Sequence, residues 1–134
     1  MASISAIRAI RQRDATRLRK GGVRTTESLL DQASTRKGRA EVSSRTGIAT
    51  TDLLKWAQQA ELMKVKGVGA EYADLLAASG VDTIKALRRR NAQNLMTALT
   101  QINGKRRRVQ RLPTVEMVQG WIDAANEMEP SVTS

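Results

Sequence analysis

The sequence predicts an all-α protein, and three observations carry this prediction. The apolar residues are mainly Leu, Ile, Val, Met and Ala, Phe is absent, and the 134 residues include only two prolines. Such a composition favours helices over sheets. Apolar residues also recur at helical spacing in several segments, and capping residues or glycines bound those segments. No segment shows a convincing strand pattern.

In the first half of the chain, the expected helices span residues 13–20, a segment after Thr25, 39–46 and 50–62. Gly21 and Gly22 end the first of them, and Thr25 is a suitable N-cap for the second. Gly47 ends the third helix. Thr50 or Thr51 caps the fourth, which has an apolar stripe on one face.

In the second half, the expected helices span residues 70–79, a short segment after Thr83, 92–102 and 115–128. Gly80 stands where a left-handed residue commonly ends a helix. Asp82 or Thr83 caps the short helix, and Asn91 caps the next one, which we expect to end at Gly104. A Leu-Pro-Thr segment opens the last helix.

The two halves match each other, which indicates an internal duplication. Residues from Ile7 onward match those from Val65 onward at an offset of 58, through a helix with inward Ala and Leu and then Gly-Val-x-Thr. At a slightly longer offset, Trp56 aligns with Trp121, and each lies in an amphipathic segment. We expect both tryptophans to be core anchors. The sequence therefore predicts two tandem repeats, 1–62 and 63–128, packed as one compact helical domain, with a flexible tail at 129–134.

The charge indicates a polyanionic partner. Lys and Arg number 23 against 13 acidic residues, a net charge of +10. The cations are clustered, since residues 1–25 carry seven of them against Asp14 alone, and later runs occupy 88–90 and 105–108. Arginine predominates in these clusters, which suits phosphate. The alternative is a solvated basic surface with no specific partner.

Two glycines one residue apart open onto a helical pattern, and we call residues 65–70 the glycine turn. Glycine adopts positive φ without a Cβ penalty and lets another molecule approach the backbone. The outward amides would lie at the positive end of the following helix, which favours phosphate, although Glu71 opposes an anion there. Alternatively, the glycines only make a tight corner. The residues expected to bind phosphate are Lys64, Lys66, Gly67, Val68, Gly69 and Ala70, with Val68 turned inward as an anchor.

The equivalent turn of the first repeat, residues 7–12, is called here the Ala9 turn and lacks both glycines. It either completes the core or binds through its side chains, for which the candidates are Arg8, Arg11 and Arg13. Because this corner is built without glycine, we expect Gly67 and Gly69 to serve binding. The later basic run is a further candidate contact, because adjacent cations repel one another and gain little within the chain; it comprises Lys105, Arg106, Arg107 and Arg108.

The pattern Lys66-Gly67-Val68-Gly69, Ala73, Leu76, Gly80-Val81-x-Thr83 resembles the helix-hairpin-helix motif of DNA-repair proteins, recombinase N-terminal domains and the C-terminal domain of the RNA polymerase alpha subunit. Through "LLKWAQQAELMKVKGVGAEYADLLAASGVDTIKAL", "RRN", "RLP" and "WI", almost the whole chain resembles a bacterial family of unknown function with paired helix-hairpin-helix units. The resemblance implies a helical fold. Paired motifs of this superfamily often approach both strands across a minor groove, and other members use the turn only for packing.

Enzyme chemistry is not expected, so we predict no catalytic residue, metal or cofactor. The chain has no His and no Cys, its acids are scattered, and the glycine turn lacks the third glycine and preceding strand of a dinucleotide site. No apolar run approaches the ~20 residues of a membrane span. The lack of cysteine favours a reducing cytoplasm, and a nucleoid association if the chain binds DNA.

The sequence thus predicts a protein that binds nucleic acid, with duplex DNA favoured over RNA, through phosphates and with little sequence preference. No helix stands out as a reader of base edges. The alternative, from a different class, is a helix-hairpin-helix module for protein interaction, an adaptor or a homodimer. In that case, the charge serves solubility or an acidic protein partner.

Overall fold

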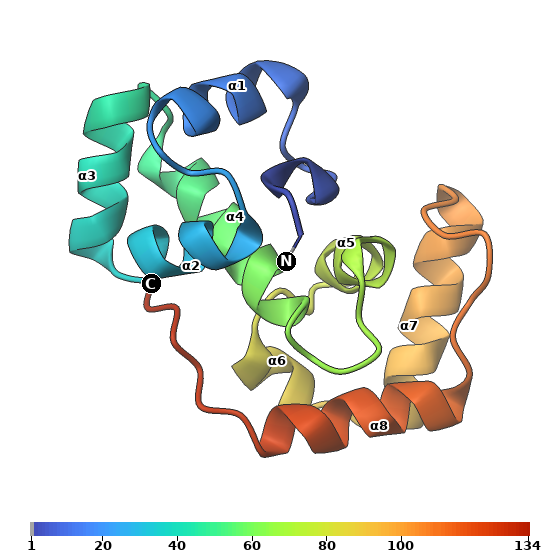
Figure 1. The fold of residues 1–134 in the computed structure, drawn as a ribbon. Helices are drawn as coiled ribbons and strands as arrows, with labels where there is room; N and C mark the ends of the chain where they lie inside the picture. Colours follow the sequence, from blue (N-terminus) through green and yellow to red (C-terminus); the bar gives the residue numbers. More distant parts are fainter. Residues whose placement is uncertain (1) are drawn as a thin grey trace. The chain divides into compact units, whose positions relative to one another are not determined.

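The structure is a computed structural model that describes residues 2–134, and over these residues it is all-helical, which confirms the predicted fold class (Figure 1). The only pairing of β type in the described chain is an isolated bridge between Ser3 and Thr25. One 3-10 helix and eight α-helices follow one another along the chain: η1 (Ile4–Ala6), α1 (Gln12–Lys20), α2 (Thr26–Ala33), α3 (Arg36–Thr46), α4 (Thr50–Leu62), α5 (Ala70–Ala78), α6 (Ile84–Arg88), α7 (Ala92–Lys105) and α8 (Val115–Asn126).

The chain divides into two units. Unit 1 holds residues 2–61 together with Ser131–Ser134, and unit 2 holds Leu62–Pro130. Unit 1 therefore contains η1 and α1–α4, and unit 2 contains α5–α8. The boundary lies at the end of α4, within a residue of the position where the sequence match separates the two halves.

Unit 1 is built on an aliphatic core with one tryptophan. In this unit, α3 packs on both α1 and α2, and η1 packs on α1. The isoleucines of the N-terminal segment are buried with the inward faces of the helices, and Trp56 is 4% exposed. The fully buried large side chains of unit 1 are Ile4, Ile7, Leu18, Leu29 and Leu53. Each contributes roughly 1.5–3 kcal/mol through the apolar area it removes from water.

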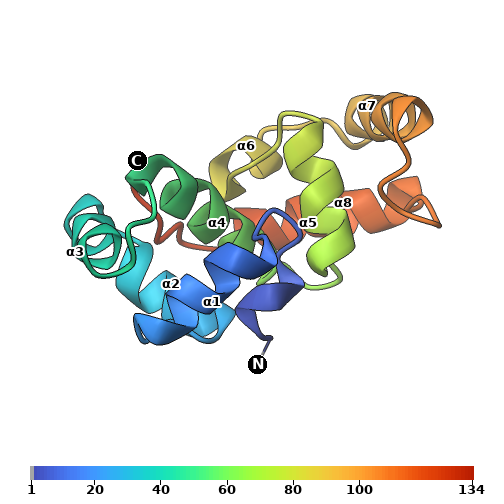
Figure 2. The same ribbon diagram turned by 90° about the horizontal axis from the view of Figure 1, so that it is seen from above.

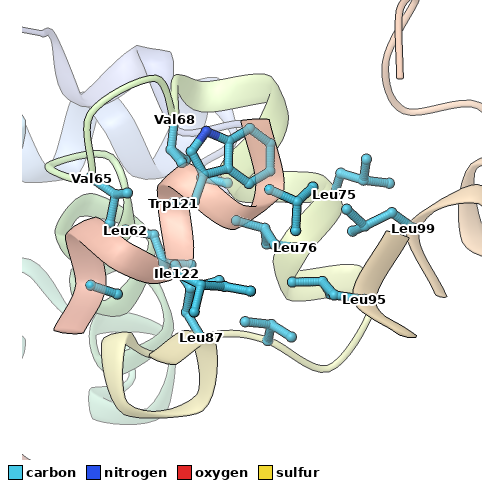
Figure 3. Close-up of a cluster of buried hydrophobic side chains, with 14 of the residues drawn as sticks. Leu62, Val65, Val68, Leu75, Leu76, Leu87, Leu95, Leu99, Trp121 and Ile122 are labelled. Carbon is cyan, nitrogen blue, oxygen red and sulfur yellow. The ribbon is translucent and has the colours of Figure 1, made fainter. Parts of the chain in front are cut away.

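Unit 2 has an equivalent core around Trp121, which is 2% exposed (Figure 3). Helix α8 packs on α6 and α7, and α5 packs on α7. Helices α7 and α8 cross steeply, since α7 lies upright in Figure 1 and is seen end-on in Figure 2, while α8 stays horizontal in both. Figure 3 shows Val68 of the glycine turn beside the indole ring of Trp121. Both tryptophans are thus core residues, as the sequence predicts.

Several backbone hydrogen bonds recur in the two units at a spacing of 58 residues. Those of the two turns, all 3.0–3.1 Å long, are Ile7 N to Ile4 O, Ile10 N to Ile7 O, Val65 N to Leu62 O and Val68 N to Val65 O. Beyond α1 and α5, Gly22 and Gly80 have φ of 88° and 87°. The following threonines, Thr25 and Thr83, cap α2 and α6 through their side chains. The two segments therefore share these hydrogen bonds and the glycine and threonine geometry after α1 and α5.

Several predicted helix ends are wrong: α8 ends at Asn126, two residues earlier than expected, and the largest differences are in α7 and α3. Helix α7 does not stop at Gly104 but runs to Lys105, because Gly104 lacks the positive φ of a residue that ends a helix, and a Cβ there would meet nothing within 4 Å. Helix α3 begins at Arg36, three residues earlier than expected, because the Thr35 side chain caps it by accepting a hydrogen bond from the Gly38 amide. A glycine inside a helix weakens it by only about 1 kcal/mol, so tertiary packing overrides the signal.

The C-terminal residues, which the sequence predicts to be a flexible tail, make hydrogen bonds within unit 1. Residues 131–134 belong to unit 1, where they make hydrogen bonds to Ser34, Arg39 and Glu61. Residue 130 closes unit 2. The segment has no regular secondary structure, so its position depends on these side-chain and backbone contacts.

Candidate nucleic-acid interface

The glycine turn separates an apolar inner side from a polar outer side. Val65 and Val68 are buried in the core of unit 2, at 1% and 4% exposure. The residues that alternate with them are exposed, namely Lys64, Lys66, Gly67 and Gly69. Val68 is therefore an internal anchor that holds the turn, as expected, and a molecule in solution meets the two lysines and the glycine backbone instead.

Gly67 is fixed by the core of its own unit. Its φ is +89°, a conformation that residues with a Cβ rarely adopt. A Cβ at this position would also stand 3.1 Å from the Nε1 atom of Trp121. The comparison with the Ala9 turn therefore carries no argument about Gly67, because no described residue other than glycine has a positive φ and Ala9 does not share the conformation of Gly67. That Gly67 binds phosphate stays a prediction.

Gly69 has no such internal requirement. It is the N-cap of α5 in an extended conformation, with φ −94° and ψ −170°, and a Cβ there would meet nothing within 4 Å. Any residue could occupy the position sterically, and serine, threonine, aspartate or asparagine would satisfy an amide of the first helical turn. Glycine instead leaves the start of α5 with no side-chain cap.

Among the seven α-helices other than α4, two start without a side-chain cap. Side chains cap five helices, α2, α3, α6, α7 and α8, through Thr25, Thr35, Thr83, Asn91 and Thr114. Helices α1 and α5, which follow the two turns, start at Arg11 and Gly69 without a side-chain cap. The first amides of a helix carry its positive partial charge, so an uncapped, exposed start favours an external anion.

A shallow hollow of about 350 Å³ lies beside the glycine turn. Its lining includes Gly67, Gly69, Gln110 and Arg111. The Tyr72 hydroxyl donates a hydrogen bond of 3.1 Å to the Arg111 carbonyl, which places the segment after α7 next to the start of α5. Sequence reasoning did not place Arg111 at the turn. Glu71 also lines the hollow and is the one carboxylate in it.

The basic run after α7 divides into two kinds of residue. Arg108 forms an ion pair of 3.2 Å with Asp74 of α5, and Arg107 donates to the carbonyls of Val109 and Gln110. These two arginines therefore gain contacts within the chain, contrary to the sequence argument about adjacent cations. Lys105 and Arg106 are exposed and remain the candidates of the run for contact with a partner.

The Ala9 turn carries its cations on side chains. Arg8, Arg11 and Arg13 are exposed, as is Ala9 itself. A hollow of about 390 Å³ lies beside it, lined by Ala9, Arg11, Asp14, Asp52, Lys55 and Trp56. Two cations and two carboxylates share this hollow, so its charge is mixed. The turn lacks the glycine backbone of its counterpart, and its hollow has two carboxylates where the other has one.

The described chain shows neither a metal-binding cluster nor a helix that could cross a membrane. Among residues 2–134, no three His, Cys, Asp or Glu side chains lie close enough to hold a metal ion. No described helix combines the length and the apolar character that a membrane crossing requires. The candidate site thus rests on backbone amides, lysine and arginine.

Comparison with known proteins places the chain in a family. A family model described as a domain of unknown function, DUF4332, matches residues 8–128 and thus extends over both turns and α1–α8. No curated protein and no solved structure shows a detectable match to the chain. Because the family model matches most of its length, the chain belongs to the DUF4332 family of domains of unknown function.

Proposed function

We propose that this protein binds duplex DNA through its phosphates with little sequence preference, and that the glycine turn of unit 2 is a helix-hairpin-helix phosphate site. One observation carries the proposal: Gly69 stands, exposed, at the uncapped start of α5, where nothing inside the protein requires a glycine. A glycine there keeps the first amides of α5 open to close approach, and a phosphate oxygen is their natural acceptor.

The charges around the turn support an anionic partner. Lys64 and Lys66 are exposed on it, and Arg111 lines the adjoining hollow. Each can add a charge-assisted hydrogen bond or a screened Coulomb attraction to a phosphate group. Glu71 works against this attraction, but it is one carboxylate against three cations.

The hydrogen bonds shared by the two turns support a pair of helix-hairpin-helix motifs, one in each unit. In this proposal, the motif of unit 1 has lost its glycines and contacts phosphate through arginine side chains, with Arg8, Arg11 and Arg13 as the candidates. Lys105 and Arg106 extend the contact in unit 2. Base edges are not read, because the proposed donors are backbone amides and cations that recognise phosphate.

The proposal is tested by giving α5 the cap that it lacks. Gly69→Asp supplies a carboxylate N-cap to a residue that already has the extended conformation of one, so we expect the fold to gain about 0.5–1 kcal/mol. The same carboxylate occupies the amides and repels phosphate, so affinity for duplex DNA should fall at least tenfold. Asn91→Asp is the matched control, because it adds the same charge at the N-cap of α7, in the same unit.

A stabilised variant with weakened DNA binding, beside a control with nearly native binding, supports the phosphate site. If both variants lose the same affinity for duplex DNA, the effect comes from the change in net charge and not from the turn. Unchanged binding in both would make the turn architectural. The same titration with duplex RNA as competitor distinguishes the two nucleic acids, since the proposal expects DNA to be preferred.

A second candidate function is protein interaction. The observation in its favour is that the fold of unit 2 itself explains Gly67, through its positive φ and its contact with Trp121. In that case, the turn only joins helices, and Lys66→Glu leaves DNA binding unaltered in a folded protein. A tenfold loss of DNA binding in Lys66→Glu would reject this alternative.

A further inference from the structure

The C-terminal segment of the chain lies on unit 1 as an extended peptide. Ser131, Thr133 and Ser134 are exposed and Val132 is half-buried, so no large apolar side chain anchors the segment. Its contacts with unit 1 are hydrogen bonds, and most of them involve its backbone. A segment held in this way is recognised by its extended shape rather than by its sequence.

Glu61, in the last turn of α4, is the first element of the surface beneath the segment. It is 4% exposed, and one of its carboxylate oxygens accepts hydrogen bonds from the Ser131 amide (2.7 Å), the Ser131 hydroxyl (2.6 Å) and the Val132 amide (3.3 Å). A buried carboxylate is costly without donors, and the end of a helix is the less favourable end for a negative charge. The donors of the C-terminal segment supply that compensation.

Arg39 of α3 is the second element, and it is 3% exposed. It donates to the carbonyls of Ala33 and Ser34 at the end of α2 and to the carbonyl of Thr133. Burial, followed by the nearby charge of Arg36, lowers the pKa of Arg39. The Ser34 carbonyl also accepts a hydrogen bond of 2.8 Å from the Thr133 amide. Unit 1 thus binds both backbone groups of Thr133: Arg39 donates to its carbonyl, and the Ser34 carbonyl accepts from its amide.

These contacts have the pattern of a site that pairs with a peptide backbone. Two buried charges of opposite sign face the segment, and three consecutive amides of the segment are bound, those of Ser131, Val132 and Thr133. We propose that Ser34, Arg39 and Glu61 form a docking site for an extended peptide. The chain's own C-terminal segment fills this site here, and the same segment of a second copy fills it when the chain's own segment is displaced.

The test uses the full-length chain with Ser131→Pro and Thr133→Pro. These two changes remove two of the three bound amides and the hydroxyls of Ser131 and Thr133, and they leave the docking site itself unaltered. The probe is a labelled hexapeptide with the sequence of residues 129–134, and its binding is followed by fluorescence anisotropy. An attached segment competes at an effective concentration on the order of mM, so we expect the variant to bind the probe at least about tenfold tighter than the native chain.

Two controls make the outcome specific. A hexapeptide with proline at the positions of Ser131 and Thr133 should not bind, and Glu61→Gln in the variant should weaken binding of the native hexapeptide about tenfold. Equal probe binding by the variant and the native chain, or none by the variant, overturns the proposal. Amide exchange of the native protein gives a second measurement: the amides of residues 131–133 should be protected, and exchange at unprotected rates would also overturn it.

Discussion

The Nε1 atom of Trp121 stands 3.1 Å from the place where a Cβ on Gly67 would lie. This contact links the glycine turn to the core of unit 2, since Trp121 is buried and packs its ring 5.1 Å from that of Tyr72. The contact also distinguishes the roles of the two glycines of the turn. Gly67 is a requirement of the fold, whereas Gly69 faces open space.

The first prediction compares these glycines by alanine substitution. Gly67→Ala forces a Cβ into a left-handed conformation and against the indole, so it should cost about 1–3 kcal/mol of unfolding free energy. Gly69→Ala meets no atom and needs no positive φ, so its effect should stay within about 0.5 kcal/mol. Urea unfolding of both variants measures the difference, and equal losses would show that the two glycines have the same role.

Removing the two lysines at the glycine turn should make DNA binding less dependent on salt concentration. If Lys64 and Lys66 each neutralise one phosphate, Lys64→Gln with Lys66→Gln lowers the magnitude of the salt slope by about 2. Lys85→Gln, on the exposed side of α6, is a control for the loss of charge alone. Filter-binding titrations at several salt concentrations provide the slopes. Equal slopes for the double variant and the native protein would remove the lysines from the interface.

Residues of the basic run that make contacts within the chain should matter for stability, and exposed ones should matter for DNA binding. Arg108→Ala breaks a partly buried ion pair with Asp74 and should cost about 1–3 kcal/mol of stability. Arg106→Ala changes an exposed side chain, so stability should be preserved while DNA affinity falls. Unfolding and binding curves of the same two proteins test this division. It would be contradicted if Arg106→Ala were the destabilising variant and Arg108→Ala were not.

The Ala9 turn should contribute through side chains alone. Arg11→Gln with Arg13→Gln should reduce the magnitude of the salt slope by about 2, because each arginine is proposed to neutralise one phosphate. Ala9→Gly should leave affinity unaltered, since no open glycine backbone is proposed there. If the arginine variant binds with the native slope, unit 1 has a structural role and unit 2 binds DNA alone.

Local signals in the sequence predicted most of the helices. Thr25, Thr83 and Asn91 cap the helices that they were expected to cap, because a short polar side chain satisfies the first amides of a helix. Gly47 and Gly80 have the positive φ expected after a helix. The tryptophans are buried in both units, as the periodic pattern indicated.

Contacts between distant residues could not be predicted in this way. The Asp74–Arg108 pair joins residues 34 positions apart, and the Glu61–Ser131 contact joins residues 70 apart. Neither leaves a periodic or capping signal, so the basic run looked free of internal partners and the C-terminus looked flexible. The role of Gly67 was hidden in part for the same reason, because a Cβ there would meet Trp121, which lies 54 positions further along the chain.

The central claim is that the protein binds duplex DNA through phosphates, and its most direct test is the dependence of the binding constant on salt. A duplex of mixed sequence is titrated with the native protein over a range of salt concentrations. With roughly 4–6 phosphates neutralised, log K against log salt should fall with a slope of about −4 to −5. A slope near zero, or no binding at low salt, would contradict the claim.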